Sequence, residues 1–303
     1  MEKLKGLIAA PFTPMDEMGE INFSKIETLI QLYEKNNVKG AFVSGSTGEG
    51  VSLSYEEKRL LIKEWGKAKS TSFRSLIMLG GTCLKEMQQL AIHAQDCQMD
   101  GISILCPYYF RPGSVEALVS FCKQITDTVP EMPFYYYHIP ALTGGNFSMP
   151  KFLELADEQI PSLAGIKYTA TNVMDYHLCR MYKSGKYDIL WGVDEALLSG
   201  LAVGAEGAVG STYNYAAPLY NQIFEAFHNG NLSKAEHLQQ QAVKMVELLV
   251  KYGGTEAGKA FMKLIGVDCG WFRPPLSRPS DEEVEELKKE LTEINFFDFC
   301  SKP

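Results

Sequence analysis

The chain has 303 residues, of which 46% are hydrophobic and 22% charged, and its formal net charge is −8. This composition is typical of a soluble globular protein, and the length suits two domains or one large α/β barrel. The negative charge argues against nucleic acid or an anionic membrane surface as a partner. No apolar stretch reaches the roughly 20 residues that span a bilayer.

Eight short apolar runs in the first two-thirds of the chain are predicted to be strands. Amphipathic segments separate them, and helix start signals occur at Ser54, Ser114 and Ser148, the last followed by Pro150. Eight βα repeats predict a closed parallel (β/α)8 TIM barrel, whereas an open doubly wound sheet would show the same alternation with another strand count. The predicted strands are Gly6–Ala10, Gly40–Val43, Leu76–Leu79, Gly101–Cys106, Phe134–His138, Ala164–Tyr168, Asp188–Gly192 and Gly207–Gly210.

The strand signal disappears from about Ala216 onward, while helical periodicity continues. The segment Gly266–Pro279, with its Pro274-Pro275 pair, is the clearest linker. We therefore predict a barrel catalytic domain over residues 1–215 and a helical extension over 216–303 packed on it. The helices predicted in the extension are Leu219–Phe227, Ser233–Lys251, Thr255–Leu264 and Ser280–Ile294.

A glycine-rich loop, Gly45-Ser46-Thr47-Gly48-Glu49-Gly50, follows the second predicted strand. Functional groups of such barrels lie at the carboxyl ends of the strands. The three glycines permit a tight turn that would present backbone N–H groups and the hydroxyls of Ser46 and Thr47 to an anion. No lysine follows in the register of a phosphate-binding Walker loop.

Tyrosines occur at the fourth and fifth strands, as Tyr108-Tyr109 and Tyr135-Tyr136-Tyr137. Because side chains alternate along a strand, Tyr135 and Tyr137 should share one face, and Tyr136 should take the other. A tyrosine hydroxyl at the barrel mouth could relay a proton. We expect His138, the next residue, to be a packing side chain rather than a catalyst.

Lys167 interrupts the apolar sixth strand. Lysine is almost never buried without a partner, so two interpretations arise. The ammonium could reach water at the end of the strand while its stem stays buried. Alternatively, desolvation could favour a neutral amine that attacks a carbonyl to form a Schiff base.

The seventh strand ends in Gly192-Val193-Asp194-Glu195 and the eighth in Gly210-Ser211-Thr212. Two carboxylates would repel a phosphate, so these ends favour a neutral ligand with several hydroxyls. Asp194 and Glu195 could equally be the N-cap and first-turn acids of the following helix. The sequence leaves both interpretations open.

The cysteines and histidines indicate neither a disulfide framework nor a metal site. The seven cysteines contain no CxxC pair, and the five histidines show no H-E-x-x-H spacing. The short apolar run Leu7–Ala10, which stops at Pro11, is too short for a signal peptide. We therefore expect a cytoplasmic protein with reduced cysteines and without a metal or other cofactor.

Taken in order, Gly-Ser-Thr-Gly-Glu, Tyr-His-Ile-Pro-Ala-Leu, Gly-Ile-Lys-Tyr-Thr, Gly-Val-Asp-Glu and Gly-Ser-Thr-Tyr-Asn resemble the dihydrodipicolinate synthase and N-acetylneuraminate lyase superfamily. The resemblance is to its N-acetylneuraminate lyase branch. It implies a class I aldolase that cleaves N-acetylneuraminate to pyruvate and N-acetylmannosamine, with Lys167 forming the Schiff base. It also implies a homotetramer, with sialic acid and pyruvate as the small-molecule ligands and no cofactor.

The resemblance further implies roles for the strand-end residues. Tyr137 would move the proton of the hydroxyl whose carbon–carbon bond breaks, and Ser46 and Thr47 would hold the carboxylate. Tyr109 would enter from a neighbouring subunit and complete a hydroxyl relay with Ser46 and Tyr137. Residues that match positions gripping the hydroxylated chain of the sugar are Thr169, Gly192, Asp194, Glu195 and Ser211.

One position departs from the synthase branch of the superfamily. Where that branch has an arginine for a second carboxylate, this chain has Leu142, which disfavours a dicarboxylic substrate. Another pyruvate-dependent keto-acid lyase or synthase of the superfamily remains the alternative. A binding protein without catalysis would require Lys167 or Tyr137 to be missing, and both are present. The resemblance does not define what the Lys251–Thr255 region contributes to selectivity.

Overall fold

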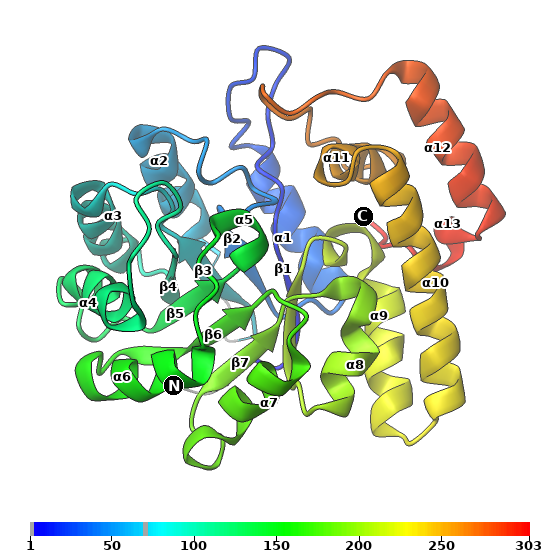
Figure 1. Cartoon of the computed structure of the whole chain (residues 1–303). Helices are drawn as coiled ribbons and strands as arrows, with labels where there is room; N and C mark the ends of the chain where they lie inside the picture. Colours follow the sequence, from blue (N-terminus) through cyan, green and yellow to red (C-terminus); the bar gives the residue numbers. More distant parts are fainter. Residues whose placement is uncertain (1–2, 69–71) are drawn as a thin grey trace.

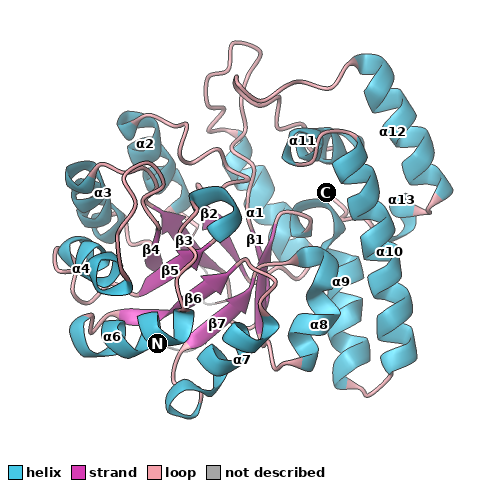
Figure 2. Cartoon of the chain, in the orientation of Figure 1, coloured by secondary structure: helices cyan, strands magenta, loops and turns pink. Residues whose placement is uncertain are grey.

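The computed structural model describes residues 3–68 and 72–303 of the chain. Eight parallel strands follow one another around a closed barrel, and β8 pairs with β1 to complete it (Figures 1 and 2). The predicted (β/α)8 barrel is thus confirmed. The strands are β1 Gly6–Ala9, β2 Gly40–Val43, β3 Arg74–Met78, β4 Gly101–Leu105, β5 Phe134–His138, β6 Leu163–Tyr168, β7 Asp188–Trp191 and β8 Gly207–Gly210.

Nearly every strand residue is buried, because one face of each strand fills the barrel and the other packs under the helices. The inner and outer faces form two separate apolar clusters. Tyr135 and Tyr137 belong to the inner cluster and Tyr136 to the outer one, as the alternation predicts. His138 is buried, with its ring centroid 5.0 Å from that of Tyr168. Burial lowers the pKa of His138 to about 4, so it packs as a neutral ring.

An outer ring of helices covers the barrel (Figure 2). Ser54 and Glu57 form a capping box at the start of α2, and the Ser114 hydroxyl accepts from the Ala117 N–H at the start of α4. Ser148 is the N-cap of α6, although its hydroxyl makes no cap hydrogen bond. The ring helices are α1 Lys25–Lys35, α2 Tyr55–Trp65, α3 Leu84–Asp96, α4 Val115–Thr126, α6 Met149–Gln159, α7 Val173–Met181 and α8 Leu197–Ala202.

Three short helical turns, two after strands and one directly after α7, were not predicted, because each is too short to show a period. They are α5 Pro140–Thr143, the 3-10 helix η1 Tyr182–Ser184 and the 3-10 helix η2 Asp194–Ala196.

The C-terminal part is helical, as predicted, and lies along one side of the barrel (Figure 1). Its first helix starts six residues before the predicted Leu219 and bends at Ala216, just ahead of Pro218. A proline inside a helix removes a donor and clashes with the preceding turn, which is why the sequence pattern begins only beyond it. The expected domain boundary at residue 215 falls in this helix, and the division stays a prediction. The helices are α9 Tyr213–His228, α10 Leu232–Lys251, α11 Thr255–Leu264, α12 Asp281–Glu293 and α13 Phe296–Phe299.

The end of the chain returns to the barrel. The Ser301 N–H donates to the Tyr215 carbonyl at 2.7 Å, and Asn36 bonds both the N–H and the carbonyl of Lys302. Within the described ranges, no helix is long and apolar enough to cross a membrane.

Candidate active site

A cavity of about 480 Å³ opens at the carboxyl ends of the strands. Its wall combines strand ends, the β2–α2 loop and residues of α10 and α11. All predicted site residues line this cavity except Tyr109, which is expected to act in a neighbouring subunit. Those that line it are Ser46, Thr47, Tyr137, Lys167, Thr169, Gly192, Asp194, Glu195 and Ser211.

Lys167 is 4% exposed, so its side chain does not extend into bulk water. Its Nζ lies 4.1 Å from the ring centroid of Phe42 and 4.0 Å from that of Tyr137. Among residues 3–68 and 72–303, no carboxylate oxygen lies within 4.0 Å of this amine. A buried, unpaired amine between two rings at a cavity wall fits a nucleophile better than a structural cation.

Tyr137 and Lys167 face each other across neighbouring strands, because they are register partners in the β5–β6 pair. The Tyr137 hydroxyl lies 3.4 Å from the Ser46 Oγ, and its ring meets Phe42 edge-on with centroids 5.4 Å apart. One strand pair and one loop thus bring an amine and two hydroxyls to one spot. This arrangement can attack a carbonyl and relay a proton beside it.

Asp194 is buried at the end of β7, and the loop after β8 holds its carboxylate. Its Oδ2 accepts the Thr212 N–H at 2.9 Å and the Thr212 hydroxyl at 2.7 Å. The N-caps of η2 and α8 are Val193 and Ala196, so the interpretation of Asp194 as an N-cap is wrong, although Asp194 and Glu195 are the first-turn acids of η2. Oδ2 receives both bonds, which leaves Oδ1 for a ligand hydroxyl.

The charge state of Asp194 depends on its surroundings. Burial raises the pKa of the Asp194 carboxyl to about 6, against the two hydrogen bonds from Thr212, which lower it. The charge of Glu195 raises this pKa further, and that of Lys167 lowers it. The carboxyl therefore titrates just below neutral pH.

Two glycines make room for the polar groups at the strand ends. A Cβ on Gly210 would lie 2.1 Å from Asp194 Oδ1, and a Cβ on Gly192 would lie 2.1 Å from Thr169 Oγ1. The Gly192 N–H donates to the Tyr168 carbonyl at 2.9 Å, so it is not also a donor for a ligand. The Thr169 hydroxyl is buried against Gly192.

Glu195 and Ser211 sit nearer the surface than Asp194 does. Glu195 is exposed and Ser211 half-buried. The backbone carbonyls of both residues accept side-chain amides, from Gln239 at 2.9 Å and from Asn214 at 2.6 Å. These bonds fix the backbone and leave the carboxylate and the hydroxyl at the cavity wall.

Tyr109 is the one predicted site residue that does not line this cavity. It lies in the β4–α4 loop and is 79% exposed, beside Phe110, which is 85% exposed. The two rings contact edge to face, with centroids 5.0 Å apart.

The sequence interpretation left the role of the Lys251–Thr255 region undefined and did not predict that α10 contributes to the cavity. Val246 and Leu249 on α10 and Thr255 at the start of α11 line its wall. Thr255 belongs to the region whose role was undefined, whereas Lys251 bonds Glu290 at the surface. An apolar face on a helix gives no signal of the distant strand ends that it meets. Within the described ranges, no three His, Cys, Asp or Glu side chains form a group that could hold a metal ion.

Comparisons with known proteins bear on the chemistry of this site. The model of the Dihydrodipicolinate synthetase family matches residues 3–294. Human N-acetylneuraminate lyase is 40% identical over 303 residues, which cover 98% of this chain and 95% of the relative.

Solved structures resemble the whole chain as well. Proteus mirabilis N-acetylneuraminate lyase has a TM-score of 0.94 at 37% identity, covering 97% of this chain and 100% of its own. A catalytic lysine mutant of Ruminococcus gnavus sialic acid aldolase has a TM-score of 0.89 at 26% identity, covering 97% of each chain.

Proposed function

Since the chain belongs to the dihydrodipicolinate synthetase family, we propose that it is a class I aldolase that cleaves N-acetylneuraminate to pyruvate and N-acetylmannosamine. The observation that carries the proposal is the Lys167 amine, buried and unpaired, facing Tyr137 in the cavity at the strand ends. Relatives named N-acetylneuraminate lyase over nearly the full length support it. The relative solved as a catalytic lysine mutant also supports a lysine nucleophile.

The proposed reaction begins with attack of the Lys167 Nζ on the C2 carbonyl of the open-chain sugar acid. Loss of water leaves a protonated imine, which accepts the electron pair of the C3–C4 bond. The Tyr137 hydroxyl accepts the proton of the C4 hydroxyl and passes its own proton to the carboxylate of the substrate as that bond breaks and the aldehyde forms. Protonation of the enamine at C3 and hydrolysis of the imine then release pyruvate and return the amine.

The position of these residues around one cavity at the strand ends supports the proposed binding roles. Ser46 and Thr47 would hold the substrate carboxylate beside the imine. Asp194 would accept a hydroxyl of the sugar chain, with Glu195 and Ser211 nearer the cavity entrance. Thr169 and Gly192 would shape the wall between them. The reaction so described uses no metal or other cofactor.

A direct test incubates the purified protein with N-acetylneuraminate and measures pyruvate and N-acetylmannosamine by mass spectrometry. We expect both products in equal amounts. Turnover of other pyruvate-derived sugar acids, measured in parallel, addresses the alternative of another keto-acid lyase. Cleavage of one of those acids without cleavage of N-acetylneuraminate would favour that alternative. Leu142 disfavours only a dicarboxylic substrate, so any monocarboxylic sugar acid is a suitable comparison.

The ionisation of Asp194 should be visible in the pH profile. Because the pKa of Asp194 is raised to about 6, its carboxylate gains a proton as the pH falls through that value and becomes a weaker acceptor. We expect kcat/KM, which reports the free enzyme, to fall below about pH 6. In Asp194→Asn, this acid limb should disappear. At neutral pH, kcat/KM should be about 10- to 100-fold lower, as expected for one lost hydrogen bond to a charged group. An unchanged acid limb in the variant would contradict this assignment.

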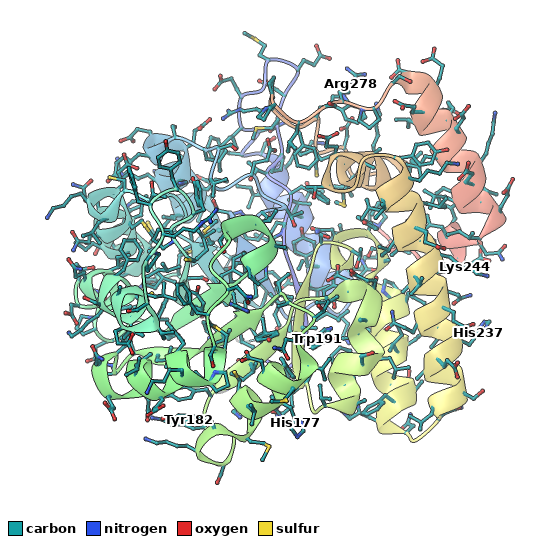
Figure 3. All side chains as sticks on the ribbon, in the orientation of Figure 1. His177, Tyr182, Trp191, His237, Lys244 and Arg278 are labelled. Atoms are coloured by element: carbon teal, nitrogen blue, oxygen red, sulfur yellow. The ribbon has the colours of Figure 1, made fainter. Side chains whose placement is uncertain are left out.

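We also propose a homotetramer in the cytoplasm. Two separate exposed apolar patches support the assembly, since a tetramer with two kinds of interface needs two such surfaces. One is the Tyr109–Phe110 pair, and the other is the outer face of α7. Figure 3 shows His177, also on α7, at the periphery of the molecule. The residues of the α7 patch are Val173, Met174, Leu178 and Met181. All seven cysteines are free, which is typical of a reducing compartment.

The two patches should differ in their effect on catalysis. Charges at α7, as in Met174→Glu/Met181→Glu, should split the tetramer into dimers that keep most of their activity. Tyr109→Phe should leave the assembly intact but lower kcat about tenfold or more, because a relay hydroxyl is lost. Sedimentation velocity and steady-state kinetics measure the two effects. A monomeric wild-type protein with full activity would contradict the role of Tyr109.

A further inference from the structure

A buried ion pair joins the β2–α2 loop to the C-terminal extension. Glu49 Oε1 lies 3.1 Å from Lys259 Nζ, and the two side chains are 2% and 0% exposed. Among residues 3–68 and 72–303, this is the ion pair in which both partners are almost completely buried. Removing two charges from water is costly unless further hydrogen bonds satisfy both groups, so the placement calls for a reason.

The remaining polar atoms of the pair are bonded to the segment that follows α11. Glu49 Oε2 accepts the Arg273 N–H at 3.0 Å, and Lys259 donates to the Trp271 carbonyl at 2.9 Å. The ammonium also lies 4.5 Å from the centroid of the Phe272 ring. Glu49 is therefore held by two points of the extension at once.

The backbone conformation at Glu49 favours glycine, which indicates that a glutamate occupies this position because its side chain is needed. Its φ is +57°, a left-handed conformation that favours glycine. The Glu49 N–H donates to the Ser46 carbonyl at 3.1 Å, which closes a turn that contains Thr47. A displacement of Glu49 would therefore move the two residues whose hydroxyls line the cavity.

A second set of contacts holds the same loop and the same helix. The Thr13 hydroxyl donates to the Gly48 carbonyl at 2.6 Å. The neighbouring Phe12 packs on α11, where a Cβ on Gly258 would lie 2.5 Å from its ring. Because α11 also places Thr255 in the cavity wall, these contacts link the loop, α11 and the wall of the cavity.

We propose that Glu49 and Lys259 are positioning residues that fix Ser46 and Thr47 and thereby set the affinity of the site for the carboxylate of a 2-keto acid. The inference rests on the proposed function and deepens it by assigning a task to the extension. The pair lies behind the loop rather than in the cavity, so it acts through Ser46 and Thr47 rather than on the ligand.

The test separates recognition of the carboxylate from formation of the imine. Wild type, Glu49→Gln and Lys259→Met are incubated with increasing pyruvate and reduced with borohydride, and the adduct is measured by intact mass. Acetone, which has a ketone but no carboxylate, is the second probe. For both variants, we expect the half-saturating pyruvate concentration to rise about tenfold or more, the effect of one weakened charge-assisted hydrogen bond. The yield with acetone should stay unchanged.

A matched control removes a different ion pair that also joins the barrel to the C-terminal extension. In Glu57→Gln, the pair between α2 and Arg273 is lost, while a glutamine can keep the capping box with Ser54. We expect this variant to bind pyruvate as wild type does. Equal weakening in the control and in Glu49→Gln would overturn the proposal.

The double variant Glu49→Gln/Lys259→Met keeps the proposal testable if the single variants fold poorly, since no unpaired buried charge remains. We expect its melting temperature to recover toward that of wild type while its pyruvate affinity stays weak. Affinity that recovers together with the melting temperature would mean a merely structural role and would overturn the inference. Absence of a pyruvate adduct in wild type would instead overturn the proposed function.

Discussion

Lys167→Met should abolish cleavage of N-acetylneuraminate while the protein remains folded. The amine is the group that forms the imine, and the site holds it between Phe42 and Tyr137. Methionine has nearly the same length and suits an apolar sandwich, so folding should not suffer. We expect kcat/KM to fall on the order of 10⁴-fold or more, which is the usual effect of removing a covalent catalyst. Steady-state assays of pyruvate release measure it.

The control for this substitution is another buried lysine. Lys58 on α2 is 6% exposed and lies outside the cavity, so Lys58→Met removes a buried amine without touching the site. We expect this variant to keep its activity. Loss of activity in both variants to the same extent would mean that the effect of Lys167→Met is one of folding, and the assignment of the nucleophile would fail.

Tyr137→Phe should leave imine formation largely intact and slow the breaking of the carbon–carbon bond. The hydroxyl, 3.4 Å from Ser46 Oγ, is the group that we propose to move the C4 hydroxyl proton. Its removal keeps the ring, and hence the packing against Phe42 and Lys167. We expect kcat to fall about 10²- to 10⁴-fold, the usual contribution of a positioned acid–base group. Borohydride trapping with pyruvate should still label the variant.

The same strand offers a matched control for Tyr137. Tyr135 faces the same interior, but its hydroxyl donates to Asp188 Oδ2 at 3.1 Å, at the opposite end of the strands. Tyr135→Phe should cost about 1 kcal/mol of stability and leave kcat unchanged. If Tyr137→Phe cleaved N-acetylneuraminate at the wild-type rate, the hydroxyl would have no part in the proton transfer.

The features that the sequence predicted well are those that local pattern determines. Alternation along β5 separates Tyr136 from Tyr135 and Tyr137, and Lys167 stands out because a charge interrupts an apolar strand. Parallel strands of a barrel end at one rim, so residues that follow different strands must meet there. Strand order and site composition therefore follow from eight short patterns.

The features that the sequence did not predict depend on contacts between distant segments. Asp194 could equally have been an N-cap by its sequence, and nothing local indicates that Thr212, after the next strand, bonds its carboxylate. Glu49 and Lys259 are separated by 210 residues. Each looks like an ordinary charged residue of a loop or a helix until the fold buries both.

The most direct test of the central claim is to locate the covalent adduct. The wild-type protein is reduced with borohydride in the presence of pyruvate, digested and mapped by tandem mass spectrometry. The account predicts one reduced pyruvyl group, attached to Lys167, with buried Lys58 and Lys259 unlabelled. An adduct at another lysine, or no adduct under conditions in which N-acetylneuraminate is cleaved, would contradict it.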